Sequence, residues 1–200
     1  MPTVRLFAHA ARPWSAPFSA AVMPGAVAAL ALALVLALLP GAATAHGPTP
    51  KKVEKSVVIA ADPAAVWAVV GDFAAIAAWH PDVAASTGSG GNVAGGTRTV
   101  TLKAGGDLVD GLDEVDAAGM SYAYRLGTPN IEAFPVSFYT ASLKVEPDPG
   151  GAKVTWMGRF YRADTGNFPP DELNDDAAIA AMDAFFADGL AGLKAKLEAK

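Results

Sequence analysis

A histidine between a tryptophan and a proline is the first candidate for chemistry in this sequence. Trp79, His80 and Pro81 end a predicted short helix. Imidazole titrates near neutral pH, so His80 is a candidate to hydrogen-bond a ligand or to exchange a proton. Catalysis by a histidine also needs an orienting group, and the sequence identifies none for it. The alternative is structural: Trp79 packs in the core and His80 caps the helix end, where a cation is favourable.

Aromatic and arginine side chains recur along the predicted strands. Successive strand residues point to opposite faces, so one set should line a cavity and the other should meet solvent. Aromatic residues with a few polar groups form ligand pockets, but they also form ordinary β-sheet cores, and both interpretations stay open. The candidate cavity residues are Trp79, His80, Arg98, Tyr122, Tyr124, Tyr139, Trp156, Arg159 and Phe186.

An acidic stretch comprises Asp107, Asp110, Asp113, Glu114 and Asp116. Carboxylate oxygens bind metal ions, but this spacing fits no calcium loop. We interpret the stretch as a solvated strand face, with a docking surface for a basic partner as the alternative.

Other sites with recognisable patterns are missing from the sequence. It contains no cysteine, which excludes thiol catalysis, thiolate metal sites and disulfides. It shows no Ser-His-Asp set, paired-carboxylate site, two-histidine zinc motif or dinucleotide fingerprint, and no cofactor is expected. The glycine-rich segment 88–96 precedes a strand rather than a helix, so we interpret it as a flexible hairpin loop and not as a phosphate cradle.

Positioning these residues requires a run of strands between helices. Asp62 and Pro63 are typical of a helix start, and this helix should end near Val70. A second short helix is expected over 73–79. Alternation and turn residues predict strands at 53–59, 83–87, 97–103, 108–115, 120–126, 137–145 and 152–162.

The last element is a long amphipathic helix. Acidic residues between 171 and 176 favour its N-terminus. Its apolar stripe comprises Ile179, Met182, Phe186, Leu190, Leu193 and Leu197. We therefore predict an α+β helix-grip fold, in which a curved antiparallel sheet of six to seven strands wraps around the long C-terminal helix, with two short helices after the first strand.

The first 45 residues are typical of a secretory signal peptide. Arg5 and Arg12 precede an apolar run over 26–39, and Ala43-Thr44-Ala45 ends it. The run is too short to span a bilayer comfortably, so we expect cleavage after Ala45, export to the periplasm and no membrane span in the mature protein. An uncleaved anchor and a start at Met23 remain alternatives.

The mature protein should consist of an extended lead-in at 46–52 and one domain at 53–200. Removing Arg5 and Arg12 from the 15 basic residues leaves 13 against 20 acidic residues, a net charge of −7. This charge argues against nucleic acid as a partner and suits a basic protein. A free amine and imidazole at His46 could chelate copper, but two nitrogens make an incomplete site.

The element order resembles the SRPBCC (START-like) superfamily, polyketide cyclase/dehydrase group. The residues that carry the resemblance are 64–67, Asp72-Phe73, Trp79-His80-Pro81, 134–139 and 154–161. The resemblance implies a cavity between sheet and helix that binds sterols, lipids, hormones or polyketides, and some members are enzymes.

A narrower resemblance is to periplasmic methanol-oxidation accessory proteins (MxaD-like). It rests on 46–50, Trp79-His80-Pro81, Arg98-Thr99 and 169–175. It implies a non-enzymatic protein that assists contact between a quinoprotein methanol dehydrogenase and its c-type cytochrome. The alternatives are a periplasmic carrier of a small hydrophobic ligand or lipid, and a polyketide cyclase/dehydrase-like enzyme.

Overall fold

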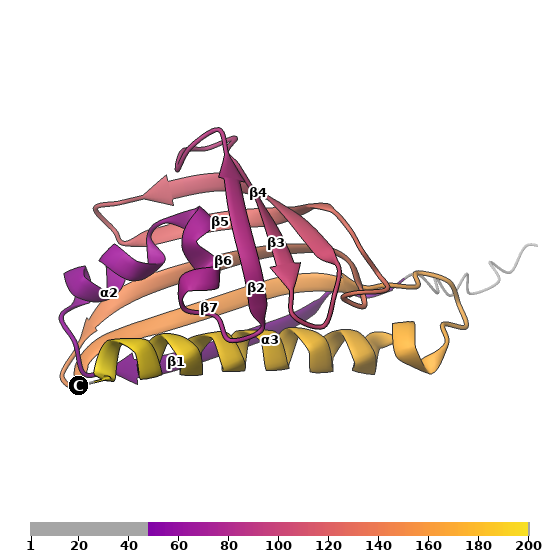
Figure 1. Cartoon of the computed structure of the whole chain (residues 1–200). Helices are drawn as coiled ribbons and strands as arrows, with labels where there is room; N and C mark the ends of the chain where they lie inside the picture. The colour runs from indigo at the N-terminus through magenta and orange to yellow at the C-terminus, as the bar shows by residue number, and fades with distance from the viewer. Residues whose placement is uncertain (1–47, 200) are drawn as a thin grey trace, which may run out of the picture. The chain divides into compact units, whose positions relative to one another are not determined.

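Seven antiparallel strands form one curved sheet in the computed structural model, which describes residues 48–199 (Figure 1). The strand order is β1-β7-β6-β5-β4-β3-β2. The strands are β1 (Lys51–Ile59), β2 (Val83–Ser89), β3 (Thr97–Leu102), β4 (Asp107–Asp116), β5 (Ser121–Thr128), β6 (Val136–Asp148) and β7 (Gly151–Arg162). Every prediction of a strand is confirmed, and β1 begins earlier than expected because Lys51 and Lys52 pair with Phe160 and Arg159 of β7.

Two short helices connect β1 to β2. Helix α2 (Pro63–Val70) begins as predicted, with the Asp62 carboxylate accepting a hydrogen bond from the Ala64 N–H. The 3-10 helix η1 (Phe73–Ala78) has the same kind of cap, in which Asp72 accepts from the Ala74 N–H. Both caps satisfy backbone donors that a helix start leaves unpaired.

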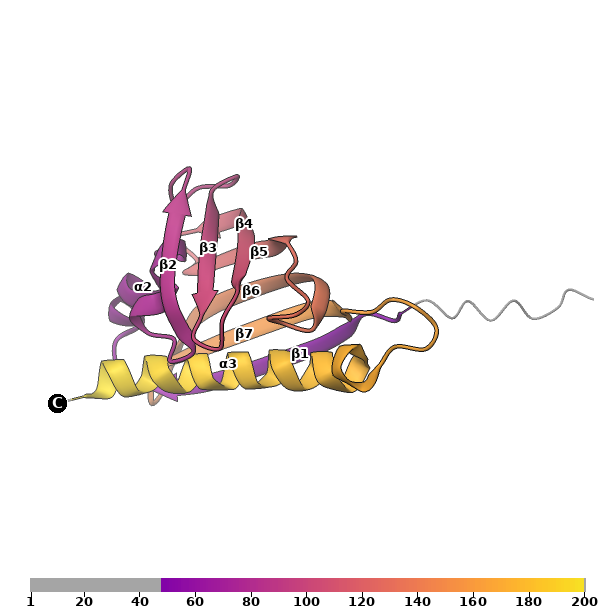
Figure 2. The same ribbon diagram turned by 45° about the vertical axis from the view of Figure 1, so that its right-hand side comes forward.

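The long helix α3 (Asp175–Glu198) lies along the concave side of the sheet, as Figures 1 and 2 show. It follows the 3-10 turn η2 (Asp171–Leu173), and Asn174 caps it by accepting from the Ala177 N–H. Its buried face comprises Ala178, Met182, Phe186, Gly189, Leu190 and Leu193. The predicted stripe was wrong at its first position, because Ala178 faces the core and Ile179 is exposed.

Glycines allow α3 and the sheet to approach closely. A Cβ atom on Gly189 of α3 would lie 2.6 Å from the His80 Cδ2 atom and 2.8 Å from the Trp156 Cζ3 atom. On the opposing strand β7, a Cβ atom on Gly158 would lie 2.8 Å from the Met182 Cε atom. The aromatic core therefore occupies the space that side chains at positions 158 and 189 would otherwise fill.

The helix-grip architecture is thus confirmed. No helix among residues 48–199 is long and apolar enough to cross a membrane. The predicted signal peptide and the first two residues of the lead-in lie outside the described residues, so the signal peptide remains a prediction.

The close approach at Gly189 predicts a specific loss of stability. In a helix without such contacts, Gly→Ala is stabilising by about 1 kcal/mol. Gly189→Ala should instead lower the free energy of unfolding by about 1–3 kcal/mol, because the methyl group overpacks the core. Urea denaturation measures the difference, and the substitution Ala191→Gly, at an exposed position two residues further along α3, gives the propensity effect alone. An increase in stability for Gly189→Ala would contradict this packing.

Candidate functional site

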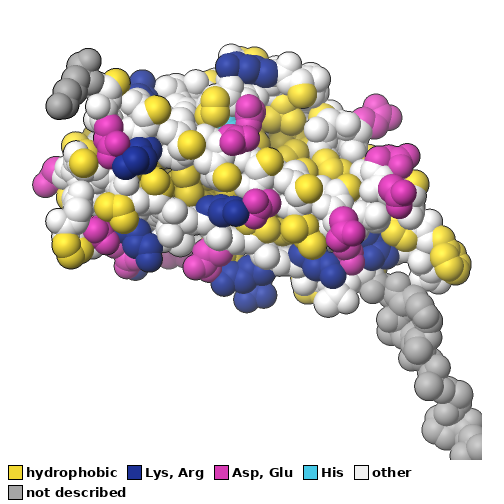
Figure 3. Space-filling view, turned by 90° about the horizontal axis from the view of Figure 1, so that it is seen from below, with side chains coloured by type: hydrophobic (Ala, Val, Ile, Leu, Met, Phe, Trp, Pro, Cys, Tyr) yellow, Lys and Arg dark blue, Asp and Glu magenta, His cyan; other side chains and the backbone are white. Residues whose placement is uncertain are grey.

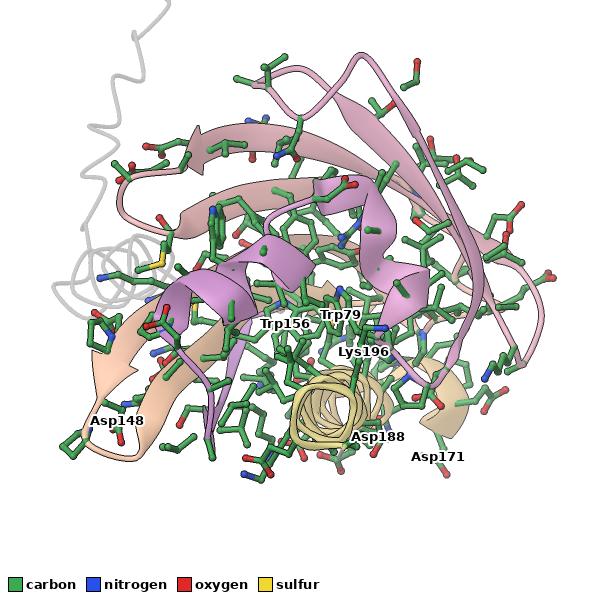
Figure 4. The ribbon with its side chains drawn as sticks, turned by 60° about the vertical axis from the view of Figure 1, so that its left-hand side comes forward. Trp79, Asp148, Trp156, Asp171, Asp188 and Lys196 are labelled. Carbon is green, nitrogen blue, oxygen red and sulfur yellow. The ribbon has the colours of Figure 1, made fainter. Side chains whose placement is uncertain are left out.

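A continuous aromatic cluster fills the space between α3 and the sheet. Figure 4 shows Trp79 and Trp156 between the helix and the strands. Trp156 stacks on Phe186 with ring centroids 4.4 Å apart, and it meets Trp79 edge-on at 5.6 Å. Its indole N–H donates a hydrogen bond of 3.0 Å to the Tyr124 hydroxyl. This bond links the centre of the cluster to a polar group deeper in the sheet.

His80 is buried, and two hydrogen bonds fix its tautomer. The Asp82 N–H donates to Nδ1 at 3.1 Å, so Nδ1 must be unprotonated. Nε2 therefore carries the proton and donates to the Phe185 carbonyl of α3 at 2.9 Å. Burial lowers the pKa of His80 to about 4, although the hydrogen bond to Phe185 opposes this shift.

These contacts correct the sequence interpretation of His80. It neither titrates near neutral pH nor acts as a cation at the helix end. It is a neutral side chain that connects the segment between η1 and β2 to α3 by hydrogen bonds. Both of its ring nitrogens are used in these bonds, so neither is free for a substrate.

A buried ion pair is the strongest electrostatic feature of the interior. Arg98 and Asp110 face each other on β3 and β4, and the Arg98 Nε donates to Asp110 at 2.9 Å with both side chains buried. The Tyr139 hydroxyl donates to the second oxygen of the same carboxylate. Arg98 also donates to the Phe73 carbonyl at 3.0 Å.

Aromatic rings enclose the arginine of this pair. The Arg98 guanidinium lies 4.1 Å from the Phe73 ring centroid and 4.6 Å from that of Tyr124. Such contacts with aromatic ring faces stabilise a cation held away from water.

Burial and the two charges together raise the pKa values of the buried groups around the ion pair. Burial raises the pKa of Asp110, and the positive charge of Arg98 opposes that rise. Burial lowers the pKa of Arg98, but the Asp110 carboxylate and the neighbouring tyrosines together outweigh burial and raise the pKa. Burial, reinforced by the charge of Asp110, raises the pKa of Tyr139 well above its usual range. Tyr139 is therefore a hydrogen-bond donor at neutral pH and not a phenolate base.

The enclosed cavity beside this cluster is very small. It is lined by Leu108, Tyr124, Phe134, Tyr139, Met182, Phe185 and Phe186, and its volume is about 10 Å³. That space holds about one water molecule. The expected ligand-sized space is filled here by side chains of the protein itself.

A groove lies directly outside this cavity, between α3, the β3–β4 turn and the loop at 129–135. Its volume is about 230 Å³. Phe134 and Phe185 line both the groove and the inner cavity, and their rings meet edge-on at 5.7 Å. These two rings therefore separate the groove from the interior.

Eight of the nine candidate residues come together in the interior. Trp79, His80, Arg98, Tyr122, Tyr124, Tyr139, Trp156 and Phe186 are all buried. Arg159 is not with them: Gly158 and Phe160 point inward on β7, so Arg159 is exposed on the outer face. Its selection as a cavity residue was wrong, because it has the opposite parity to Trp156.

Sequence reasoning missed Asp110 as a member of this cluster. The interpretation of the acidic stretch as a solvated face is wrong at this residue, which is 1 % exposed. A signal was available: Leu108, Asp110 and Leu112 alternate, as do Arg98, Val100 and Leu102, so both charges occupy inward positions.

The charged and imidazole groups of the described interior are bonded within the protein, whereas the Trp79 indole N–H and the Ser86 hydroxyl have no hydrogen-bond partner. The His80 nitrogens and the Asp110 oxygens are bonded within the protein. Among residues 48–199, no three histidine or carboxylate side chains are grouped to hold a metal ion. His46, the candidate copper ligand, lies outside the described residues.

The buried ion pair predicts strong coupling between its partners. Asp110→Leu leaves the Arg98 charge buried alone and should cost about 3–5 kcal/mol of unfolding free energy, or prevent folding. Arg98→Met combined with Asp110→Leu should recover at least half of that loss. A double-mutant cycle in urea measures the coupling, with Lys144→Met/Glu146→Leu as the surface-pair control. Additive losses at 98 and 110 would argue against the pair.

Stability should also fall in a defined pH window because of His80. Its folded pKa of about 4 lies below the unfolded value of 6.5. The stability it contributes is therefore complete above pH 6.5, is lost as pH falls, and is fully lost below pH 4. The loss amounts to about 3 kcal/mol. Unfolding free energies at pH 7 and pH 4.5 should differ less for His80→Gln than for the natural protein. Equal differences would show that His80 is not responsible.

Solved structures with the same architecture support this fold. The protein XoxI from Bacillus cereus superposes with a TM-score of 0.60 at 22% identity, over 74% of this chain and 95% of that chain. A solution structure from Thermobifida fusca gives a TM-score of 0.57 at 30% identity, over 74% and 95% of the two chains. The ZhuI aromatase/cyclase from Streptomyces sp. R1128 gives a TM-score of 0.60 at 18% identity, over 75% and 94%.

A search of curated proteins finds no match to this chain. The match to a protein family is extensive, because it runs from residue 50 to residue 198 and so includes every strand and helix described above. The chain belongs to the polyketide cyclase/dehydrase and lipid transport family, within the SRPBCC superfamily.

Proposed function

We propose that this protein is a periplasmic, non-enzymatic accessory protein of methanol oxidation, which assists contact and electron transfer between a quinoprotein methanol dehydrogenase and its c-type cytochrome. The observation that supports a non-enzymatic role is that side chains fill the interior of the protein. A cavity of about 10 Å³ cannot hold a lipid or a polyketide. The function is therefore assigned to the surface.

The charge of the protein supports a role in protein contacts. The chain from residue 46 onward has a net charge of −7. Complementary charge speeds the encounter of two proteins more than it strengthens the final complex. An accessory protein that brings partners together benefits from this kind of interaction. The choice of methanol oxidation rests on the narrower sequence resemblance.

A carrier of a small hydrophobic ligand is the second candidate, and the groove favours it. The Phe134 and Phe185 rings line both this groove and the inner cavity. Rotation of these rings would join the two spaces. The combined site would suit a small apolar ligand better than a lipid, since ligand pockets usually exceed about 300 Å³.

The accessory role predicts a measurable effect on electron transfer. The exported protein, purified from the periplasm, is added to methanol dehydrogenase and its cytochrome at low ionic strength. We expect a saturable increase in methanol-dependent cytochrome reduction that fades as salt screens the charges. An unrelated acidic protein of similar net charge is the control. An unchanged rate of cytochrome reduction at every ratio of this protein to methanol dehydrogenase would contradict the accessory role and leave the ligand carrier as the candidate function.

A further inference from the structure

Phe168 is the most exposed large hydrophobic residue that the structure describes. Its side chain is 96% exposed, against 60% for Val93 and 39% for Phe138. It lies in the loop between β7 and α3, residues 163–174. Scattered apolar side chains are normal on protein surfaces, but most are partly covered. A fully exposed phenylalanine is informative when the chain around it is held in place.

The side chain of Arg162 holds this loop. It donates hydrogen bonds to the Asp164 carbonyl at 2.7 Å and to the Gly166 carbonyl at 2.8 Å. It also pairs with Asp175, at the start of α3, at 3.4 Å. The Asp164 N–H then donates to the Leu173 carbonyl at 3.1 Å, which joins the two ends of the loop.

Two prolines restrict the chain directly after Phe168. The φ angles of Pro169 and Pro170 are fixed by their rings, and Pro169 also restricts the backbone of Phe168. The loop therefore presents the phenyl ring with little backbone freedom left to lose. Binding through a preorganised residue avoids part of the entropic cost of association.

Acidic side chains follow Phe168 closely in the sequence. Asp171, Glu172 and Asp176 are exposed, and none takes part in the ion pairs found among residues 48–199. Figure 3 shows acidic side chains at this end of the molecule, and Figure 4 shows Asp171 pointing away from its body. Asp175 is different, because Lys51 and Arg162 neutralise it.

The start of β1 lies at the same end of the molecule. Lys51 pairs with Asp175 at 3.0 Å, which ties the first strand to the start of α3. Figures 1 and 2 show the 163–174 loop projecting beyond the sheet beside this strand. The two chain segments thus form one protruding surface.

We infer that the Phe168 loop is a docking anchor for a protein partner that presents an apolar pocket rimmed by lysine or arginine side chains. Aromatic anchors inserted in pockets dominate the binding energy of many interfaces. Phe168 supplies the anchor, and Asp171, Glu172 and Asp176 supply the charge that meets the basic rim. The inference rests on the proposed function only for the identity of the partner.

Photo-crosslinking in the producing cell tests the surface without assuming a partner. The full-length protein carries p-benzoylphenylalanine at position 168, or at position 138 on the outer sheet face as the control. We expect a discrete protein crosslink from 168 that is absent from 138. Crosslinks from 168 to lipid, to a second copy of this chain, or to nothing would each overturn the inference.

The partner identified by crosslinking is then purified, and its affinity for this protein is measured. Phe168→Ala should weaken its affinity at least tenfold, whereas Phe138→Ala should change it less than twofold. Asp171→Asn with Glu172→Gln should reduce the salt dependence, unlike Glu114→Gln with Asp116→Asn on β4. Melting temperatures of all variants confirm that each one folds. Equal affinity of Phe168→Ala and the natural protein would overturn the inference.

The outcomes separate this inference from the proposed function. A crosslinked partner other than methanol dehydrogenase or its cytochrome, with the same effect of Phe168→Ala, would support the docking anchor and contradict the methanol-oxidation role. Stimulated cytochrome reduction that Phe168→Ala leaves unchanged would support that role and reject the anchor.

Discussion

The close approach of α3 to the concave side of the sheet determines most of this structure. Gly189 on the helix and Gly158 on β7 make it possible, since a methyl group at either position would meet core atoms. Trp156 can then stack on Phe186, and the Phe185 carbonyl reaches the His80 ring. The same approach leaves an enclosed volume of only about 10 Å³. Packing, histidine protonation and cavity size therefore share one cause.

A closed interior changes what the fold can contribute to function. The family fold provides a concave sheet and a helix that covers it, but here aromatic side chains occupy the space between them. The ion pair of Arg98 and Asp110 has its hydrogen bonds satisfied internally, and it links facing residues of β3 and β4. Under the function proposed above, exposed features make the contacts, and one of them is the loop whose carbonyl groups accept hydrogen bonds from Arg162.

Local patterns in the sequence were sufficient for the elements but not for the site. Strand alternation and the apolar stripe predicted every strand and α3, because burial of one face dictates both patterns. Residue type alone does not show which face a side chain takes, so Arg159 was misplaced and Asp110 was taken as solvated, although the alternation within their own strands places both correctly. The protonation of His80 depends on Phe185, more than 100 residues later, and on burial that no local pattern records. Only the shared parity of Arg98 and Asp110 with their apolar neighbours could have revealed the buried pair.

The position of β1 in the sheet has a consequence for how the chain acquires its structure. β1 lies at the sheet edge and pairs only with β7, in which Phe160 is the partner of Lys51 and Ala152 is the partner of Ile59. During synthesis from the N-terminus, β1 has no sheet partner until β7, which begins at Gly151, has been made. Such distant pairing slows folding. For the exported protein proposed above, this delay favours translocation, because a chain whose first strand is unpaired can pass unfolded through a narrow channel until β7 follows.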